Sequence, residues 1–158
     1  MTGVVELLEA RNETVATAES LTAGLLCATI VDTPGASAVV RGGLIVYATE
    51  LKHELAGVDQ QLLDEHGAVH PDVAIQLAEG ARTRCGADWG IGLTGVAGPD
   101  PQDGVAPGTV HIGLSGPGVS TVRTITLSGD RAAVRSAAVE KALVLLSDTL
   151  LAVDSGNK

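Results

Sequence analysis

The sequence predicts an α/β fold: a single three-layer domain in which helices flank a mixed β-sheet. Segments with helical and with strand periodicity alternate along the chain, and two neighbouring strand-like segments are joined by a Gly-Pro-Gly turn. No linker or internal repeat divides the 158 residues, a length typical of one domain with one sizeable core. Alternating helices and strands favour parallel pairing, whereas a hairpin is antiparallel, so we expect a mixed sheet.

The first third of the chain predicts two helices that alternate with two strands. Apolar spacing predicts a helix over Val4–Arg11, and the alternation of polar and apolar residues predicts a strand over Thr14–Ala18. A second helix is predicted over Ala23–Val31. β-formers around two adjacent glycines then predict a strand over Val39–Tyr47, with a bulge or a close backbone approach.

The middle of the chain predicts two short helices, one long helix and a buried strand. Thr49 is a candidate cap for a short helix that runs to Leu55, and Asp59 for another that runs to Glu65. Pro71 suits the first position of a longer helix, which we expect to end near Cys85. The strand follows over Asp88–Thr94.

The last third predicts a loop, a hairpin and a long final helix. Gly, Pro and Asp residues fill the segment Gly95–Pro107, and loops of that length within compact domains tend to be functional. Gly108–Ser115 and Val119–Leu127 are expected to form the hairpin. Asp130 is a candidate cap for the final helix. The apolar stripe of that helix comprises Val139, Leu143, Leu146 and Leu150.

Composition excludes several classes of partner. Ten Lys and Arg against nineteen Asp and Glu give a net charge of −9, opposite in sign to the field that a nucleic-acid or anionic-membrane binder needs. No apolar stretch is long enough for a membrane span, and the amino terminus lacks the pattern of a signal peptide, so we expect a cytoplasmic protein. The 45% apolar content and the Ala/Val/Leu-rich final helix favour a homo-oligomer.

Two groups of residues are candidates for chemistry. Glu19, Ser20 and Thr22 lie between a predicted strand and a predicted helix, where free backbone N–H groups could stabilise an alkoxide or an oxyanion. The simpler interpretation is a helix cap. Tyr47 and Lys52 lie where a strand passes into a short helix, and a bend between them would aim both side chains at one point. The alternative there is an edge tyrosine and a solvated lysine.

Other motifs are weaker. Gly90–Gly95 has the letters of a dinucleotide-binding fingerprint but lies within a predicted strand, which argues against that site. His66 and His70 have metal-ligand spacing, although the intervening Gly67 favours a loop and a helix cap, so we expect no metal. Arg131, with Arg135 one turn later, suits a phosphate group at a helix start or, equally, an ordinary solvated helix face.

Six segments, taken in order, resemble motifs of the CinA carboxy-terminal domain family. The segment AESLTAG at Ala18–Gly24 is similar to that family's AES(C)TGG, and GGLIVYATELK at Gly42–Lys52 is similar to GGFVTYSNEAK. The other segments are His66–His70, Thr94–Pro99, Pro107–Gly113 and Gly129–Arg131, similar to HGAVS, TGIAGP, PVGTVWIG and GDR. Departures from the family pattern are Leu21 for Cys, Ala23 for Gly, His70 for Ser and the substituted loop Pro101–Pro107.

The resemblance implies that residues 1–158 form a stand-alone amidohydrolase domain of this family. Such enzymes convert nicotinamide mononucleotide (NMN) and water to nicotinate mononucleotide and ammonia in pyridine-nucleotide salvage, without a cofactor. Carried over by position, the catalytic residues are Ser20 as nucleophile with Tyr47 and Lys52 as a coupled proton-transfer pair. The implied substrate-binding residues are Glu19, Thr22, Gly43, Thr94, Gly95, Gly98 and Arg131.

Some roles stay open at this point. The oxyanion is expected at amides near Thr22 or Gly43, and the phosphate at Arg131 or the amides of Gly95–Gly98. The rival function is a non-catalytic, regulatory pyridine-nucleotide-binding module. A weaker third option is a hydrolase that acts on another small amide.

Overall fold

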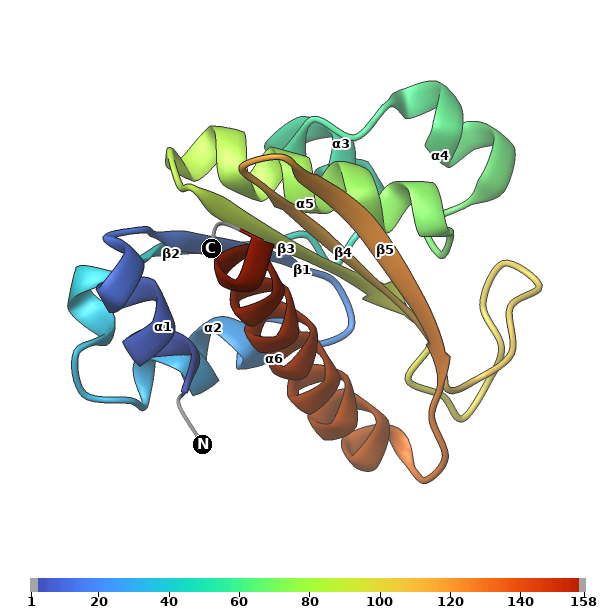
Figure 1. The fold of residues 1–158 in the computed structure, drawn as a ribbon. Helices are drawn as coiled ribbons and strands as arrows, with labels where there is room; N and C mark the ends of the chain where they lie inside the picture. Colours follow the sequence, from blue (N-terminus) through green and yellow to red (C-terminus); the bar gives the residue numbers. More distant parts are fainter. Residues whose placement is uncertain (1–2, 157–158) are drawn as a thin grey trace.

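The computed structural model describes residues 3–156, in which helices and strands alternate much as the sequence predicts (Figure 1). The helices are α1 (Val4–Arg11), α2 (Leu25–Val31), η1 (Ala36–Ala38, a 3₁₀ turn), α3 (Thr49–Ala56), α4 (Gln60–His66), α5 (Pro71–Cys85) and α6 (Arg131–Gly156). The strands are β1 (Val15–Glu19), β2 (Val40–Ile45), β3 (Trp89–Gly95), β4 (Thr109–Gly116) and β5 (Val119–Thr126).

The five strands form one mixed sheet in the order β2-β1-β3-β4-β5. The strand β1 is parallel to both of its neighbours, β2 and β3, whereas β3, β4 and β5 are successively antiparallel. The predicted mixed sheet and the predicted β4–β5 hairpin are confirmed. Because β1, β2 and β3 are parallel, their carboxyl ends meet at one edge of the sheet, so the segments that follow them lie close together.

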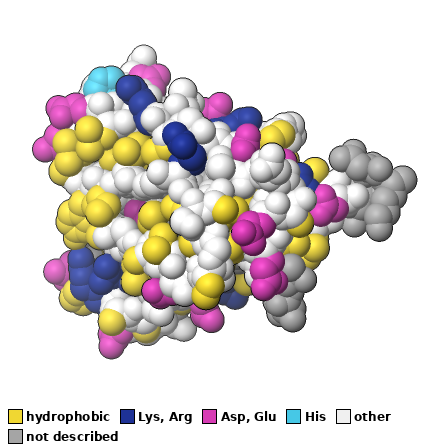
Figure 2. Space-filling view, turned by 90° about the vertical axis from the view of Figure 1, so that its left-hand side faces the viewer, with side chains coloured by type: hydrophobic (Ala, Val, Ile, Leu, Met, Phe, Trp, Pro, Cys, Tyr) yellow, Lys and Arg dark blue, Asp and Glu magenta, His cyan; other side chains and the backbone are white. Residues whose placement is uncertain are grey.

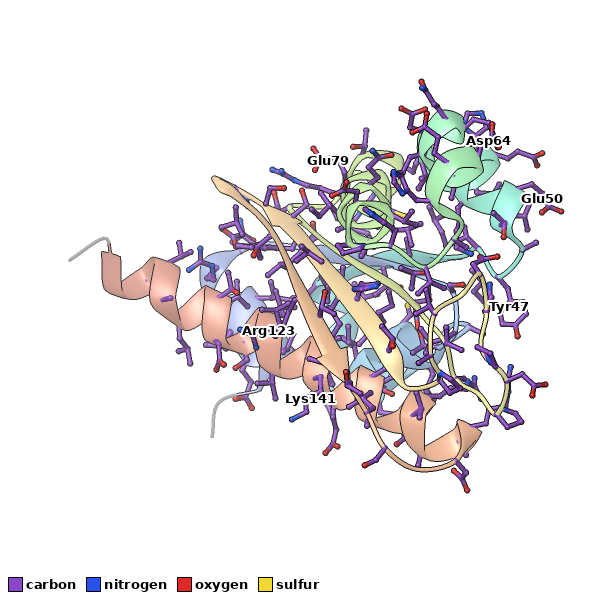
Figure 3. All side chains as sticks on the ribbon, turned by 90° about the vertical axis from the view of Figure 1, so that its right-hand side faces the viewer. Tyr47, Glu50, Asp64, Glu79, Arg123 and Lys141 are labelled. Atoms are coloured by element: carbon purple, nitrogen blue, oxygen red, sulfur yellow. The ribbon has the colours of Figure 1, made fainter. Side chains whose placement is uncertain are left out.

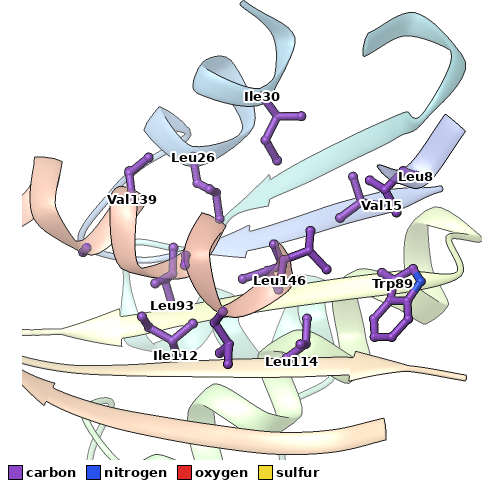
Figure 4. Packing of buried hydrophobic residues seen from close by; sticks show 14 of the residues in the cluster. Leu8, Val15, Leu26, Ile30, Trp89, Leu93, Ile112, Leu114, Val139 and Leu146 are labelled. Carbon is purple, nitrogen blue, oxygen red and sulfur yellow. The ribbon is translucent and has the colours of Figure 1, made fainter. Parts of the chain in front are cut away.

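Two apolar cores lie on the two faces of the sheet, which makes the predicted three layers. One core packs α1, α2 and α6 against the sheet, with Leu146 of α6 and Ile30 of α2 among its residues (Figure 4). The other packs α3, α4 and α5 against the opposite face through residues such as Leu63 and Leu77. Ala, Val, Leu and Ile build both cores, and Trp89, fully buried, is their one large aromatic side chain among the described residues.

Glycines in the sheet allow α5 to lie directly on it. A Cβ at Gly92 would lie 2.4 Å from the carbonyl oxygen of Ala74, and one at Gly113 would lie 2.1 Å from the same atom. A Cβ at Gly90 would lie 2.0 Å from the carbonyl oxygen of Ala78. The glycines that give this strand a dinucleotide-like sequence therefore allow the close packing of a helix on a sheet.

Most element boundaries differ from the predictions by one or two residues. The second helix begins at Leu25 rather than Ala23, because Ala23 and Gly24 are left-handed, with φ of +48° and +95°. Thr49 is the first residue of its helix and not the cap, and Gly95 ends β3 rather than opening the loop. The predicted caps are confirmed at the three positions where a side chain accepts a helix amide: Asp59, His70 and Asp130.

The surface mixes apolar and charged side chains. On the face that carries α1, α2 and β2, apolar clusters lie between acidic and basic side chains (Figure 2). Leu25, Val31 and Ile45 of α2 and β2 are among the exposed large apolar residues, which is compatible with self-association, and that association stays a prediction. None of the helices within residues 3–156 combines the length and apolarity required to cross a bilayer.

We expect Gly92→Ala to lower the free energy of unfolding by about 1–3 kcal/mol, because the new methyl group would displace α5 from the sheet. Urea unfolding at neutral pH measures the change. Gly3→Ala is the matched control, since its Cβ meets nothing within 4 Å and its φ is −77°. Equal effects of the two substitutions would contradict the packing argument.

Candidate active site

A pocket of about 340 Å³ opens at the carboxyl ends of β1 and β3. Its walls come from segments that are far apart in the sequence: Ser20 and Leu21 after β1, Tyr47 after β2, residues 95–102 after β3, and Arg131 at the start of α6. We call it the carboxyl-end pocket. The sheet topology alone brings these segments together, because ligands of open α/β sheets bind where the carboxyl ends of parallel strands diverge.

Ser20, which lines this pocket, contacts the buried Lys52. The Lys52 amino group donates a hydrogen bond to Ser20 Oγ at 3.0 Å, and its side chain is 1% exposed. The same nitrogen lies 2.7 Å from the carbonyl oxygen of Val46 and 3.3 Å from that of Tyr47. The alternative of a solvated lysine is wrong. The structure brings a hydroxyl and a buried amine into contact across 32 residues of sequence.

Burial lowers the pKa of Lys52 from 10.5 to about 8. Desolvation of the ammonium is the largest cause, and the negative charges of Glu50 and Asp103 oppose it. With this pKa about one lysine in ten is neutral at pH 7, against about one in 3,000 for an exposed lysine. A neutral amine 3.0 Å from a hydroxyl is positioned to accept its proton.

Tyr47 lies on the pocket wall, but its hydroxyl faces Arg131. The Tyr47 side chain is 58% exposed and lies beside the loop that follows β3 (Figure 3). Arg131 Nη2 donates to the Tyr47 hydroxyl at 2.9 Å, and Arg131 Nη1 donates to the Gly98 carbonyl at 2.7 Å. Lys52 instead contacts the backbone carbonyl of Tyr47. The structure therefore does not join the Tyr47 hydroxyl and the Lys52 amine as the expected coupled pair.

The seven residues expected to bind substrate divide into two groups. Gly95, Gly98 and Arg131 line the carboxyl-end pocket. Glu19 is buried, and its carboxylate accepts the amides of Leu26 and Cys27 as well as the Thr17 hydroxyl. This carboxylate therefore anchors the start of α2 and does not face the pocket.

The other three expected residues are not among those that line the pocket. Gly43 lies in β2 beside Thr17, whose hydroxyl would be 2.6 Å from an added Cβ. The Thr94 hydroxyl donates to the Ala68 carbonyl. Thr22 is fully buried, and its Oγ1 has no hydrogen-bond partner within the part of the chain that the structure describes.

Two backbone amides beside Ser20 lack a hydrogen-bond partner among the described residues. The Ser20 amide donates to the Leu93 carbonyl, and the Ala23 amide donates to the Ser20 carbonyl. Between them, the amides of Leu21 and Thr22 make no hydrogen bond to any of residues 3–156, although both residues are buried. Unpaired N–H groups in buried residues are rare and costly. Unpaired amides directly after a serine hydroxyl are the arrangement from which an oxyanion hole is built.

The sequence did not single out the Leu21 amide or Asp103. The side chain of Leu21 departs from the family pattern, but the group of interest is its backbone amide. The identity of a side chain gives no information about that amide. Asp103 lies in the substituted loop, where its carboxylate accepts the Ala68 amide at 3.3 Å and raises the pKa of Lys52. No local pattern signals the Asp103 contact, because it joins segments far apart in the sequence.

Comparisons with known proteins identify the family and the fold of the chain. The CinA C-terminal domain family matches residues 1–150. Among solved structures, a CinA superfamily protein from Klebsiella pneumoniae is 31% identical with a TM-score of 0.90, covering 94% of this chain and 93% of that one. A CinA superfamily protein from Escherichia coli is 30% identical with a TM-score of 0.85, covering 90% and 88%.

Curated relatives are more similar in sequence and considerably longer. A CinA-like protein of Frankia casuarinae is 49% identical over 143 residues, which are 90% of this chain and 33% of that protein. A CinA-like protein of an Anaeromyxobacter strain is 48% identical over 144 residues, 90% of this chain and 35% of that protein. The chain thus spans about a third of the length of these relatives.

Replacement of Lys52 by Met tests the burial of the amine through the pH dependence of stability. The lowered pKa means that the unfolded chain binds more protons than the folded one between about pH 8 and 10.5. The stability of the wild type should therefore rise relative to Lys52→Met as pH increases through that window. Urea unfolding of both proteins at several pH values measures the difference, and a difference that is independent of pH would contradict the buried position.

Proposed function

The chain belongs to the CinA C-terminal domain family, and we propose that it is an amidohydrolase that converts NMN and water to nicotinate mononucleotide and ammonia. The observation that carries the proposal is the contact between Ser20 Oγ and the buried amine of Lys52 in a pocket with unpaired amides. Serine and lysine in contact form a known acyl-transfer pair, in which the amine activates the hydroxyl.

In the first step, the Lys52 amine takes the proton of Ser20 Oγ as this oxygen attacks the carboxamide carbon. The resulting oxyanion accepts hydrogen bonds from the Leu21 and Thr22 amides. Collapse of this intermediate breaks the C–N bond, and the Lys52 ammonium returns the proton to the leaving nitrogen, which departs as ammonia. This leaves the nicotinoyl group as an ester on Ser20.

In the second step, water hydrolyses the ester. The neutral Lys52 amine takes a proton from the water, whose oxygen attacks the ester carbonyl, and then gives it to Ser20 Oγ as the C–O bond breaks. Because desolvation lowers the pKa of Lys52 to about 8, the amine is an effective base near neutral pH and its conjugate acid still protonates a leaving group.

The nucleotide is bound by the outer part of the carboxyl-end pocket. Arg131 supplies a guanidinium for the phosphate, and residues 95–98 line the same wall of the pocket. The Tyr47 hydroxyl, held by Arg131, orients that guanidinium or contacts the ribose. Tyr47 is thus a positioning residue on this proposal, and Lys52 alone transfers protons.

The main alternative is a binding module that recognises the nucleotide without cleaving it. A pocket that only binds a ligand gains nothing from burying an amine. A lysine whose pKa is lowered by burial makes the folded protein less stable at every pH below the pKa of that lysine in the unfolded chain. The contact of Lys52 with Ser20, rather than with a bound anion, favours the catalytic interpretation.

Ammonia release from NMN tests the proposal directly. We expect the wild type to release ammonia and nicotinate mononucleotide at equal rates, with and without a chelator, and Ser20→Ala to release none while retaining the wild-type circular dichroism spectrum. Sensitivity to the chelator would indicate a metalloenzyme. NMN binding without ammonia release would support the binding module. Turnover of other small amides but not of NMN would show that the enzyme is an amidohydrolase with a different substrate.

The Tyr47 hydroxyl and the Lys52 amine should differ in their effect on turnover. We expect Tyr47→Phe to lower kcat/KM by about tenfold or less, since it removes one hydrogen bond from Arg131. Lys52→Ala removes the base and should lower kcat by about 10²–10⁴-fold. Steady-state ammonia assays of both variants measure the effects, and a larger loss for Tyr47→Phe would restore Tyr47 as a proton-transfer group.

A further inference from the structure

We propose that Arg135 is a positioning residue that holds the segment after Ser20 so that its amides can bind the oxyanion. We call residues 20–24 the Ser20 loop. The inference rests on the proposed acyl transfer at Ser20 and assigns to Arg135 a role distinct from the phosphate contact suggested by its sequence position next to Arg131.

Arg135 reaches the Ser20 loop from α6, 113 residues further along the chain. Its Nε donates to the Leu21 carbonyl at 2.8 Å, and its Nη2 donates to the Thr22 carbonyl at 3.3 Å. The side chain is half-buried at this contact, so water competes less for the two carbonyl groups than at a fully exposed surface. Arg135 therefore binds two successive peptide groups of the loop.

The Ser20 loop needs such a support because its backbone is locally unfavourable. Ala23 has a φ of +48°, a left-handed conformation that residues with a Cβ rarely adopt. The Thr22 hydroxyl is buried without a hydrogen-bond partner among the described residues, so it does not stabilise the loop. Within the loop and α2, two backbone bonds assist: Ala23 N–H to the Ser20 carbonyl and Leu25 N–H to the Thr22 carbonyl.

The orientation of the carbonyl groups decides the orientation of the amides. A trans peptide is planar, so the Thr22 N–H points opposite to the Leu21 carbonyl. While Arg135 holds the Leu21 carbonyl, the Thr22 N–H faces away from the guanidinium and remains free. If this peptide rotated, a carbonyl oxygen would replace the N–H and would repel the developing oxyanion. The bond from Arg135 to Leu21 prevents that rotation.

The two arginines of α6 thereby hold two different parts of the carboxyl-end pocket. Arg131, at the start of the helix, holds the Tyr47 hydroxyl and the Gly98 carbonyl on the outer wall. Arg135, one turn later, holds the backbone beside the nucleophile. The same helix therefore aligns the substrate-binding wall with the reacting centre.

The experiment measures the rate at which a fluorophosphonate probe labels Ser20, because this reaction needs the nucleophile and the oxyanion hole but no amide substrate. We expect Arg135→Ala to lower the second-order labelling rate by about 10²-fold while the final labelled fraction stays that of the wild type. Ammonia release from NMN should fall through kcat, with KM changed less than threefold. Arg135→Gln, which retains one side-chain N–H donor group, should give intermediate rates.

Arg82→Ala is the matched control, because Arg82 makes the same kind of bond, to the Gly116 carbonyl at the other end of β4. We expect it to label at the wild-type rate. Wild-type labelling by Arg135→Ala would overturn the inference, as would equal losses in the Arg82 and Arg135 variants. If Arg135→Ala does not fold, Arg135→Gln decides: slower labelling supports the role and an unchanged rate overturns it.

The same experiment separates this inference from the proposed function. If the probe labels wild-type Ser20 but NMN releases no ammonia, the proposed substrate is wrong and the role of Arg135 is still decided by the labelling rates. If the probe does not label wild-type Ser20, the nucleophile assignment is wrong and the role of Arg135 is overturned with it.

Discussion

The contact between the Lys52 amine and the Ser20 hydroxyl is the interaction on which the rest of the site depends. A buried amine is costly unless its N–H groups find acceptors, and here two backbone carbonyls and one hydroxyl receive them. Those carbonyls belong to Val46 and Tyr47, directly after β2, so the residues at the end of an edge strand supply the acceptors for the lysine amine. The desolvation that lowers the pKa of Lys52 is therefore built from sheet topology and not from a local motif.

Topology also explains why the reacting groups can be distant in sequence and still well placed. Parallel pairing of β1 with β2 and β3 delivers Ser20, Lys52 and the loop after β3 to one edge of the sheet. Glycines in β3 and β4 let α5 lie close against the opposite side, which closes the second core without large side chains. A core built almost without aromatics needs this close backbone packing, because dispersion contacts weaken quickly with distance.

Much of the fold could be predicted from the sequence, because periodicity and capping are local. The mixed sheet, the hairpin and the caps at Asp59, His70 and Asp130 follow from residue types at short spacing. The site was predictable only in part. Ser20 and Lys52 do meet, but the Tyr47 hydroxyl turns to Arg131 and the Glu19 carboxylate turns to α2. In each case the partner lies on another element, and adjacency to a motif in the chain does not determine where a side chain points.

A chain with a net charge of −9 must bind an anionic nucleotide through local groups, because its overall field repels such a ligand. Asp100 on the pocket wall adds to that repulsion, which makes Arg131 the main attractive charge there. Arg131 already donates to Gly98 and Tyr47, yet a guanidinium carries five N–H donors, so donors remain for a phosphate. The two existing bonds hold the guanidinium plane in place before the ligand arrives, and less side-chain entropy is lost on binding. Anion recognition and the orientation of the outer wall thus depend on the same side chain.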